Sequence, residues 1–252
     1  MNPPRQTLRI AATADTHVRK GSQGALQPLF AAATEAADVL LLCGDLTDYG
    51  TVEEARILAK DTSTALRIPA IAVLGNHDLE SGQEGELVQI LTDAGVTILD
   101  GDAHEILGVG FAGVKGFAGG FGRRQLGAWG ERIIKDFVHM AIEESLKLER
   151  ALQRLRTPQK IALLHYAPIR QTVEGEPAEI QPFLGSSRLE EPIDRYRCTM
   201  VFHGHAHRGS LEGETKSKVP VYNVALPLLL AANPEKPPFR LVEVPIAEPA
   251  LT

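Results

Sequence analysis

The sequence DVLLLCGDLTD, residues 38–48, joins a run of apolar residues to a glycine and two aspartates. An apolar run of this length, bounded by turn residues, is typical of a strand that is buried on both faces. This pattern alternates with helical patterns along the chain, which predicts an α/β protein in which helices cover a sheet. The other expected strands are at 8–15, 70–77, 105–114, 160–168, 199–207, 219–226 and 239–246, and the expected helices are at 25–37, 51–66, 83–94 and 130–156.

Composition favours one compact protein of the cytoplasm. The chain has 252 residues, 44% of them hydrophobic, so we expect a single domain over 1–252. The formal net charge is −6 and no basic block is present, so the sequence does not favour nucleic acid as a partner. Cys43 and Cys198 lie in apolar runs, as buried free thiols do. The first ten residues lack a signal peptide core and 225–232 is too short to span a bilayer, so we expect no membrane anchor.

Polar side chains follow several of the expected strands at the point where each strand ends. Because the carboxyl ends of parallel strands meet at one edge of a sheet, residues that are distant in sequence can form one site there. The residues at these ends are Asp15, His17, Asp45, Asp48, Asn76, His77, Asp78, His165, His205 and His207.

The residue types at these strand ends indicate a metal site. Carboxylate and amide oxygens with imidazoles suit manganese, iron, zinc or nickel, and the absence of thiolates from the set argues against a closed structural zinc site. There are more candidate ligands than one ion needs, so we expect two divalent ions that share a carboxylate. Such a pair can activate water and hold both the attacking and the leaving oxygen of a displacement at phosphorus. Phosphoester hydrolysis is therefore the leading hypothesis for the chemistry.

Five sequence blocks also carry a resemblance to a known family. They are DTH (15–17), GDLTD (44–48), GNHD (75–78), the single His165 and GHAH (204–207). In this order they resemble the calcineurin-like metallophosphoesterase superfamily. The resemblance implies a four-layer α/β/β/α sandwich, with two mixed sheets flanked by helices.

The resemblance also implies a role for each residue of the blocks. His77 would contact the phosphoryl oxygen and protonate the leaving group, and Asp48 would accept a hydrogen bond from His77 and orient it. A hydroxide that bridges the two ions would be the nucleophile, and Asp45 would bridge the ions. The first ion would be held by Asp15, His17 and His207, and the second by Asn76, His165 and His205.

Other residues could contribute to the choice of substrate. Arg123 and Arg124, in the glycine-rich segment 116–130, are candidate phosphate-binding residues, although a solvated pair at a helix start fits them equally well. Segments 116–130 and 173–192 are long enough to cover an active site. His203 matches no block, and we expect it to be a hydrogen-bonded core residue.

Two classes of function remain open. The first is a dinuclear phosphodiesterase that acts on a small phosphorylated molecule, with a phosphomonoesterase or a nuclease of the same superfamily as the nearer alternatives. The second is a scaffold that keeps the fold without catalysis. Tyr49 stands where phosphoprotein phosphatases of this superfamily have arginine, which disfavours that branch, and Tyr166 puts a cyclic-nucleotide substrate in doubt. His77 and all the ligand positions are present, which favours an enzyme.

Overall fold

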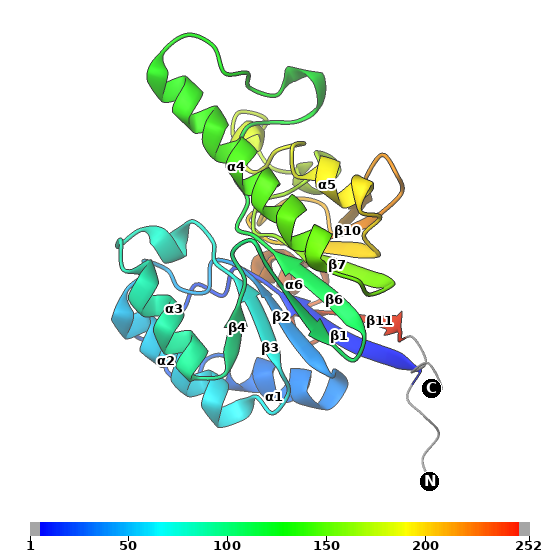
Figure 1. Ribbon diagram of the computed structural model, residues 1–252. Helices are drawn as coiled ribbons and strands as arrows, with labels where there is room; N and C mark the ends of the chain where they lie inside the picture. The colour runs from blue at the N-terminus through cyan, green and yellow to red at the C-terminus, as the bar shows by residue number, and fades with distance from the viewer. Residues whose placement is uncertain (1–5, 247–252) are drawn as a thin grey trace.

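The computed structural model describes residues 6–246 as two sheets packed face to face between helices (Figure 1). Residues 1–5, which belong to the stretch judged to lack a signal peptide core, and residues 247–252 lie outside the described part. Within residues 6–246, none of the helices has the length and apolar character needed to cross a membrane.

The first sheet is mixed, because its edge strand β11 runs antiparallel to β1 and the other strand pairs are parallel. Helices α1, α2 and α3 cover its outer face (Figure 1). In sheet order the strands are β11 (Arg240–Pro245), β1 (Thr7–Thr13), β2 (Val39–Cys43), β3 (Ala70–Val73) and β4 (Val96–Ile98). The covering helices are α1 (Gln27–Ala36), α2 (Val52–Ala65) and α3 (Glu84–Asp93).

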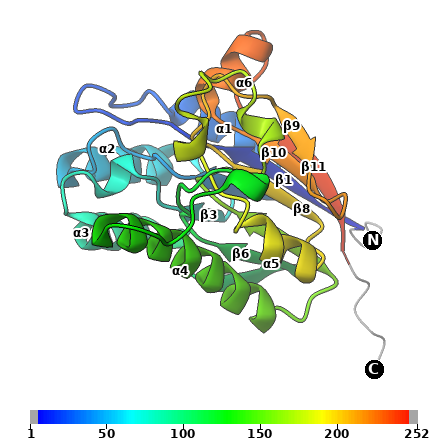
Figure 2. The same cartoon turned by 90° about the horizontal axis from the view of Figure 1, so that it is seen from above.

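The second sheet is mixed as well, with β5 and β9 antiparallel to their neighbours. Helices α4 (Arg132–Arg154) and α5 (Glu190–Arg195) lie over β6 and β8 when the molecule is seen from above (Figure 2). The strands are, in order, β5 (Asp102–Ile106), β6 (Val109–Gly113), β7 (Gln159–Leu163), β8 (Met200–His203), β10 (Pro220–Asn223) and β9 (Glu212–Glu214). A further short helix, α6 (Leu226–Ala232), follows β10. The predicted α/β/β/α sandwich of two mixed sheets is thus confirmed.

Side-chain alternation along the strands builds the core in three layers. In β2, Leu41 faces the second sheet, whereas Leu40 and Leu42 face α1 and α2. In β7, Ile161 and Leu163 point between the sheets, and Ala162 points toward α4. Both faces of these strands are apolar because both are covered, which is why their sequences read as continuous apolar runs.

The structure corrects the sequence prediction in one strand. Residues 105–114 were expected to form one strand but form the end of β5, a tight turn and β6. Leu107 and Gly108 occupy the turn with φ of 50° and 77°, and Ile106 pairs with Val109 across it. A two-residue hairpin of this kind needs positive φ at both turn positions, and leucine gives no sequence signal for it. The short strands β4 and β9 and the helices α5 and α6 were not predicted.

Candidate metal centre

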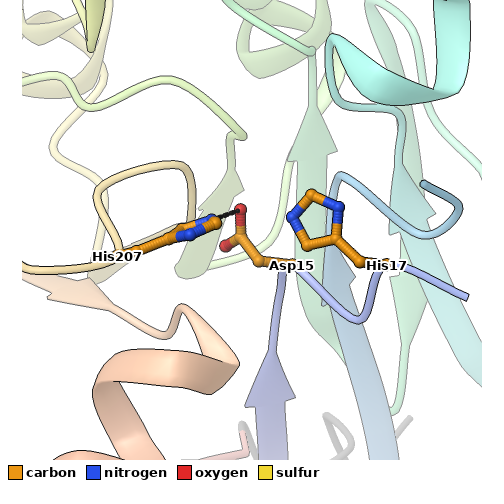
Figure 3. Close-up of side chains that lie close together, drawn as sticks. All are labelled: Asp15, His17 and His207. Carbon is orange, nitrogen blue, oxygen red and sulfur yellow. Dashed lines mark hydrogen bonds and ion pairs between the residues drawn. The ribbon is translucent and has the colours of Figure 1, made fainter. Parts of the chain in front are cut away.

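Asp15 and His17 follow β1 and meet His207 from the loop after β8. His207 Nε2 lies 3.0 Å from Asp15 Oδ1 (Figure 3). Both oxygens of the Asp15 carboxylate also accept from the main-chain amide of His205 at 3.0–3.1 Å. The hydrogen bond with Asp15 raises the pKa of His207, whereas burial lowers the pKa of His17. Asp15 is thus hydrogen-bonded to two residues of the GHAH block, the main chain of His205 and the side chain of His207.

Asp45 follows β2 and lies between two groups of histidines. Its Oδ2 is 3.4 Å from His165 Nε2 and 3.9 Å from His17 Nε2, and its Oδ1 accepts the main-chain amide of His77 at 2.9 Å. Burial favours the neutral form of Asp45, but His165 outweighs it and holds the pKa of Asp45 below its usual value. This position suits a carboxylate shared between two ions.

His165, from the loop after β7, completes a second group with Asn76 and His205. Its Nε2 lies 3.0 Å from Asn76 Oδ1, and its Nδ1–H donates to the main-chain carbonyl of Cys43 at 3.0 Å, which fixes the direction of the ring. Burial would lower the pKa of His165, but Asp45 raises it to about 9, while burial lowers the pKa of His205 to about 3. An imidazole binds metal in its neutral form, so the binding of an ion would release the proton of His165.

The predicted ligands thus come together in groups that share members. The candidate groups of His, Asp and Glu with metal-ligand spacing are Asp15–His17–His207, His17–Asp45–His77 and Asp45–His165–His205. Asn76, at 3.0 Å from His165, joins the last of these. All seven predicted metal ligands lie in one place, and their roles as ligands stay predictions.

Two features of this place fit a bound metal. Neither buried ring nitrogen of His17 makes a well-aligned hydrogen bond among the described residues, although carboxylates lie 3.2 Å from Nδ1 and 3.9 Å from Nε2, so Nε2 is available to an ion. Positive φ in non-glycine residues is uncommon, yet four of the predicted ligands adopt it: Asp15 (57°), His17 (42°), Asp45 (48°) and His205 (69°). Strained backbone of this kind clusters at functional sites, where it aims side chains that regular structure cannot aim.

Two glycines allow the carboxylates to sit close to neighbouring main chain. A Cβ atom on Gly75 would overlap Asp45 Oδ1, and one on Gly204 would overlap Asp15 Oδ2. These glycines thus make room for the carboxylates that would hold a metal.

His77 borders both groups and contacts Asp48 through the main chain. His77 Nδ1–H donates to the main-chain carbonyl of Asp48 at 2.7 Å, so the carbonyl, and not the carboxylate, orients the ring. The Asp48 carboxylate instead lies 3.2 Å from His17 Nδ1 and 2.9 Å from Arg19 Nε. The last residue of GDLTD thus meets His77 through its main chain and turns its side chain toward the loop that follows β1.

Arg123 and Arg124 contact none of these groups in the interactions found among the described residues. They line a cavity of about 580 Å³ with residues of 169–171 and 214–218, and none of the predicted metal ligands lines it. A role for them in binding the substrate stays a prediction. Segments 116–130 and 173–192 are joined by hydrogen bonds, among them Gly119 to Pro182, and the carbonyl of Phe183 lies 3.4 Å from His205 Nε2.

Two buried residues next to the ligands have structural contacts. His203 is fully buried and bonded through Nε2 to the Thr172 hydroxyl at 2.8 Å, as expected of a core histidine. Asp78 is also fully buried, and it accepts from the amides of Leu46, Thr47 and Gly75, so it ties the GDLTD block to the GNHD block. Its place in GNHD marked Asp78 as a residue of interest, but no sequence signal indicated this role.

A family model for calcineurin-like phosphoesterases matches residues 8–209, which is most of the chain and contains every predicted ligand. The chain belongs to the calcineurin-like phosphoesterase family. The predicted resemblance is therefore confirmed, and the coarse chemistry of the family, hydrolysis of phosphoesters, comes with it.

Named relatives of this phosphoesterase include an enzyme of Arcobacter nitrofigilis described as a probable glycerophosphodiester phosphodiesterase, GpdQ. It is 24% identical over 217 residues, which cover 79% of this chain and 68% of the relative. Among solved structures, phosphopantetheinyl hydrolase (PptH) of Mycobacterium tuberculosis has a TM-score of 0.66 at 15% identity, covering 92% of this chain and 95% of its own. The protein TT1561 of Thermus thermophilus has a TM-score of 0.58 at 15% identity, covering 96% and 100%. These structural likenesses show the fold.

Proposed function

We propose that this phosphoesterase hydrolyses a small-molecule phosphodiester with the help of two divalent ions. The observation that carries the proposal is the position of Asp45, whose carboxylate lies between an Asp15–His17–His207 group and an Asn76–His165–His205 group. One carboxylate between two ligand sets is the arrangement that a pair of ions requires. The oxygen and nitrogen donors suit manganese, iron, zinc or nickel.

In this reaction the ions and His77 would have different roles. When bound, the ions would supply an activated water and neutralise charge on the phosphate. His77 is partly exposed, and its ring is perpendicular to that of His17 at a centroid distance of 4.7 Å. Because Nδ1–H is committed to the carbonyl of Asp48, Nε2 of His77 is the atom that would hold and deliver the proton to the leaving group.

The preference for a diester is the finer part of the proposal. It is supported by the name of the Arcobacter nitrofigilis relative, a probable glycerophosphodiester phosphodiesterase. The DTH, GNHD and GHAH forms of the blocks are also more similar to diester-hydrolysing branches than to phosphoprotein phosphatases. We further propose a small phosphorylated substrate and a place in the cytoplasm, with no nucleic-acid partner, in keeping with the net charge of −6.

The test compares bis-para-nitrophenyl phosphate with para-nitrophenyl phosphate. Protein stripped of metal is reloaded separately with manganese, iron, zinc or nickel, and His77→Ala serves as the control for catalysis by contaminants. The proposal expects metal-dependent turnover that is faster for the diester and depends on His77. Faster turnover of the monoester would make the protein a phosphatase, and no turnover of either with two ions bound would favour a scaffold.

A further inference from the structure

A cavity of about 540 Å³ lies between α3 and α4, and none of the predicted metal ligands lines it. Leu74 and Leu79 line it, and they flank the segment that carries Asn76 and His77. Lys115, two residues after the end of β6, also lines it. The main-chain carbonyl of Lys115 accepts hydrogen bonds from the amides of His165 and Tyr166 at 3.0 Å. The volume is in the range of small-molecule sites.

The walls of this cavity are mostly apolar, and most of its charged groups are already paired. Glu144 is buried and accepts from the Gly116 amide at 2.8 Å and from Lys147 at 3.0 Å, while Lys147 also binds Asp100. Asp102 pairs with Arg154, and Glu84 is exposed at the start of α3. The apolar lining consists of Leu74, Leu79, Val88, Ile98, Leu99 and Met140.

Lys115 differs from the other charged groups because its ammonium lacks a carboxylate partner. It donates to the Gly116 carbonyl at 2.9 Å and lies 5.1 Å from the ring centre of Phe117 and 5.2 Å from that of Tyr166. Within residues 6–246 no carboxylate comes within ion-pair distance of it. An ammonium has three donor hydrogens, so two remain for a ligand. Burial lowers the pKa of Lys115, and the charge of the nearby Glu144 opposes this shift without reversing it.

The position of Lys115 relative to the metal centre suggests which part of a ligand it meets. The centre of the Tyr166 ring lies 5.2 Å from its ammonium and 4.4 Å from the centre of the His205 ring. The ammonium and a predicted ligand thus share one neighbouring ring. From this position the ammonium would meet a substituent on a group attached to the phosphorus, and not the phosphorus itself.

We propose that this cavity receives the leaving-group alcohol of the substrate and that Lys115 selects an alcohol with an anionic substituent, a carboxylate or a phosphate. The apolar walls would hold the body of the alcohol, and its reacting oxygen would point toward the segment between Leu74 and Leu79, which carries His77. This inference rests on the proposed function, because it assigns the leaving group of that reaction.

The test uses three methyl aryl phosphodiesters whose leaving phenols share one body and have comparable acidity. The phenols carry a carboxymethyl, a hydroxyethyl or an aminoethyl group at the para position. In the metal-loaded protein kcat/KM is expected to be at least about tenfold higher for the carboxymethyl ester than for the aminoethyl ester. Lys115→Met should abolish this preference and Lys115→Arg should keep part of it, whereas Lys135→Met, at an exposed lysine of α4, should keep all of it.

A second measurement does not depend on turnover. Calorimetric titration with para-hydroxyphenylacetate should show binding to the metal-loaded protein that weakens at least about tenfold in Lys115→Met, a loss typical of one charge-assisted contact. Met140→Trp, at the half-exposed rim, should weaken the binding of all three phenols by filling the cavity. Equal effects of Lys115→Met on the three phenols, or no binding by the wild type, would overturn the inference. Failure of the wild type to hydrolyse any of the esters would instead overturn the proposed function.

Discussion

Replacement of Asp78 by asparagine should weaken both the fold and the metal centre. The Asp78 carboxylate accepts four hydrogen bonds from buried groups: the amides of Leu46 and Gly75 on Oδ2, at 3.1 and 2.8 Å, and the amide and hydroxyl of Thr47 on Oδ1, at 2.8 and 2.7 Å. These bonds join the loop that carries Asp45 to the loop that carries Asn76 and His77. The change keeps the shape of the side chain and replaces one acceptor by a donor.

The size of the effect follows from these contacts. The new amide group of Asp78→Asn is best placed toward Thr47, whose hydroxyl can turn to accept from it, so one main-chain amide loses its acceptor. A buried donor left without a partner costs about 1–3 kcal/mol. The remaining bonds lose their charge assistance, but this loss is offset because burial raises the pKa of Asp78 and thus already penalises its ionised form. We expect a net loss of about 1–3 kcal/mol in the free energy of unfolding.

Urea unfolding followed by circular dichroism at neutral pH measures this loss as a lower midpoint with an unchanged slope. A matched control is Asp61→Asn, because Asp61 is equally buried and accepts from the amides of Gly24 and Leu26 at 2.9 and 3.3 Å, away from the predicted ligands. Both variants should lose stability, but only Asp78→Asn should retain less metal after desalting. Wild-type stability of Asp78→Asn, or equal loss of metal from both variants, would refute the reasoning.

Three further predictions concern the metal centre. His77→Ala should lower kcat for an aryl phosphodiester about 10²–10⁴-fold without loss of metal, as expected for a general acid, and a loss below tenfold would argue against that role. Gly75→Ala should weaken metal binding measured by titration, because its Cβ would overlap the Asp45 carboxylate, whereas Gly85→Ala has open space and should bind metal normally. Removal of the metal ions with a chelator should lower the melting temperature, because ions present at 100 times their Kd add about 2.7 kcal/mol to the free energy of unfolding. An unchanged melting temperature would mean that the folded protein does not bind the ions.

Most of the fold could be predicted from the sequence because side chains along each buried strand alternate between two faces, and both faces are covered by apolar residues. Leu40 and Leu41 point to opposite layers, and both layers are apolar, so β2 stands out as a continuous run. The hairpin at Leu107 was missed because leucine at positive φ follows no turn pattern. Strands of three residues, such as β4 and β9, are too short for any periodicity to show.

The candidate site was predicted at the level of residue identity but not of contacts. The carboxyl ends of parallel strands gather at one edge of each sheet, which is why Asp15 and Asp45 of the first sheet could be grouped from their places in the sequence. His165 joins them because the second sheet, to which β7 belongs, packs against the first. Which atom of Asp48 meets His77 depends on a local backbone turn and a side-chain rotamer, and neither has a sequence signal. The same holds for Lys115, whose unpaired ammonium becomes visible only when the walls of its cavity are known.

The most direct test of the central claim is anomalous diffraction from crystals of the protein loaded with manganese, recorded at the manganese absorption edge. The account predicts two peaks about 3.5–4 Å apart, one on each side of the Asp45 carboxylate. One peak is expected within reach of His17 and His207, and the other within reach of His165 and His205. A single peak, or peaks away from Asp45, would contradict a dinuclear centre at this place.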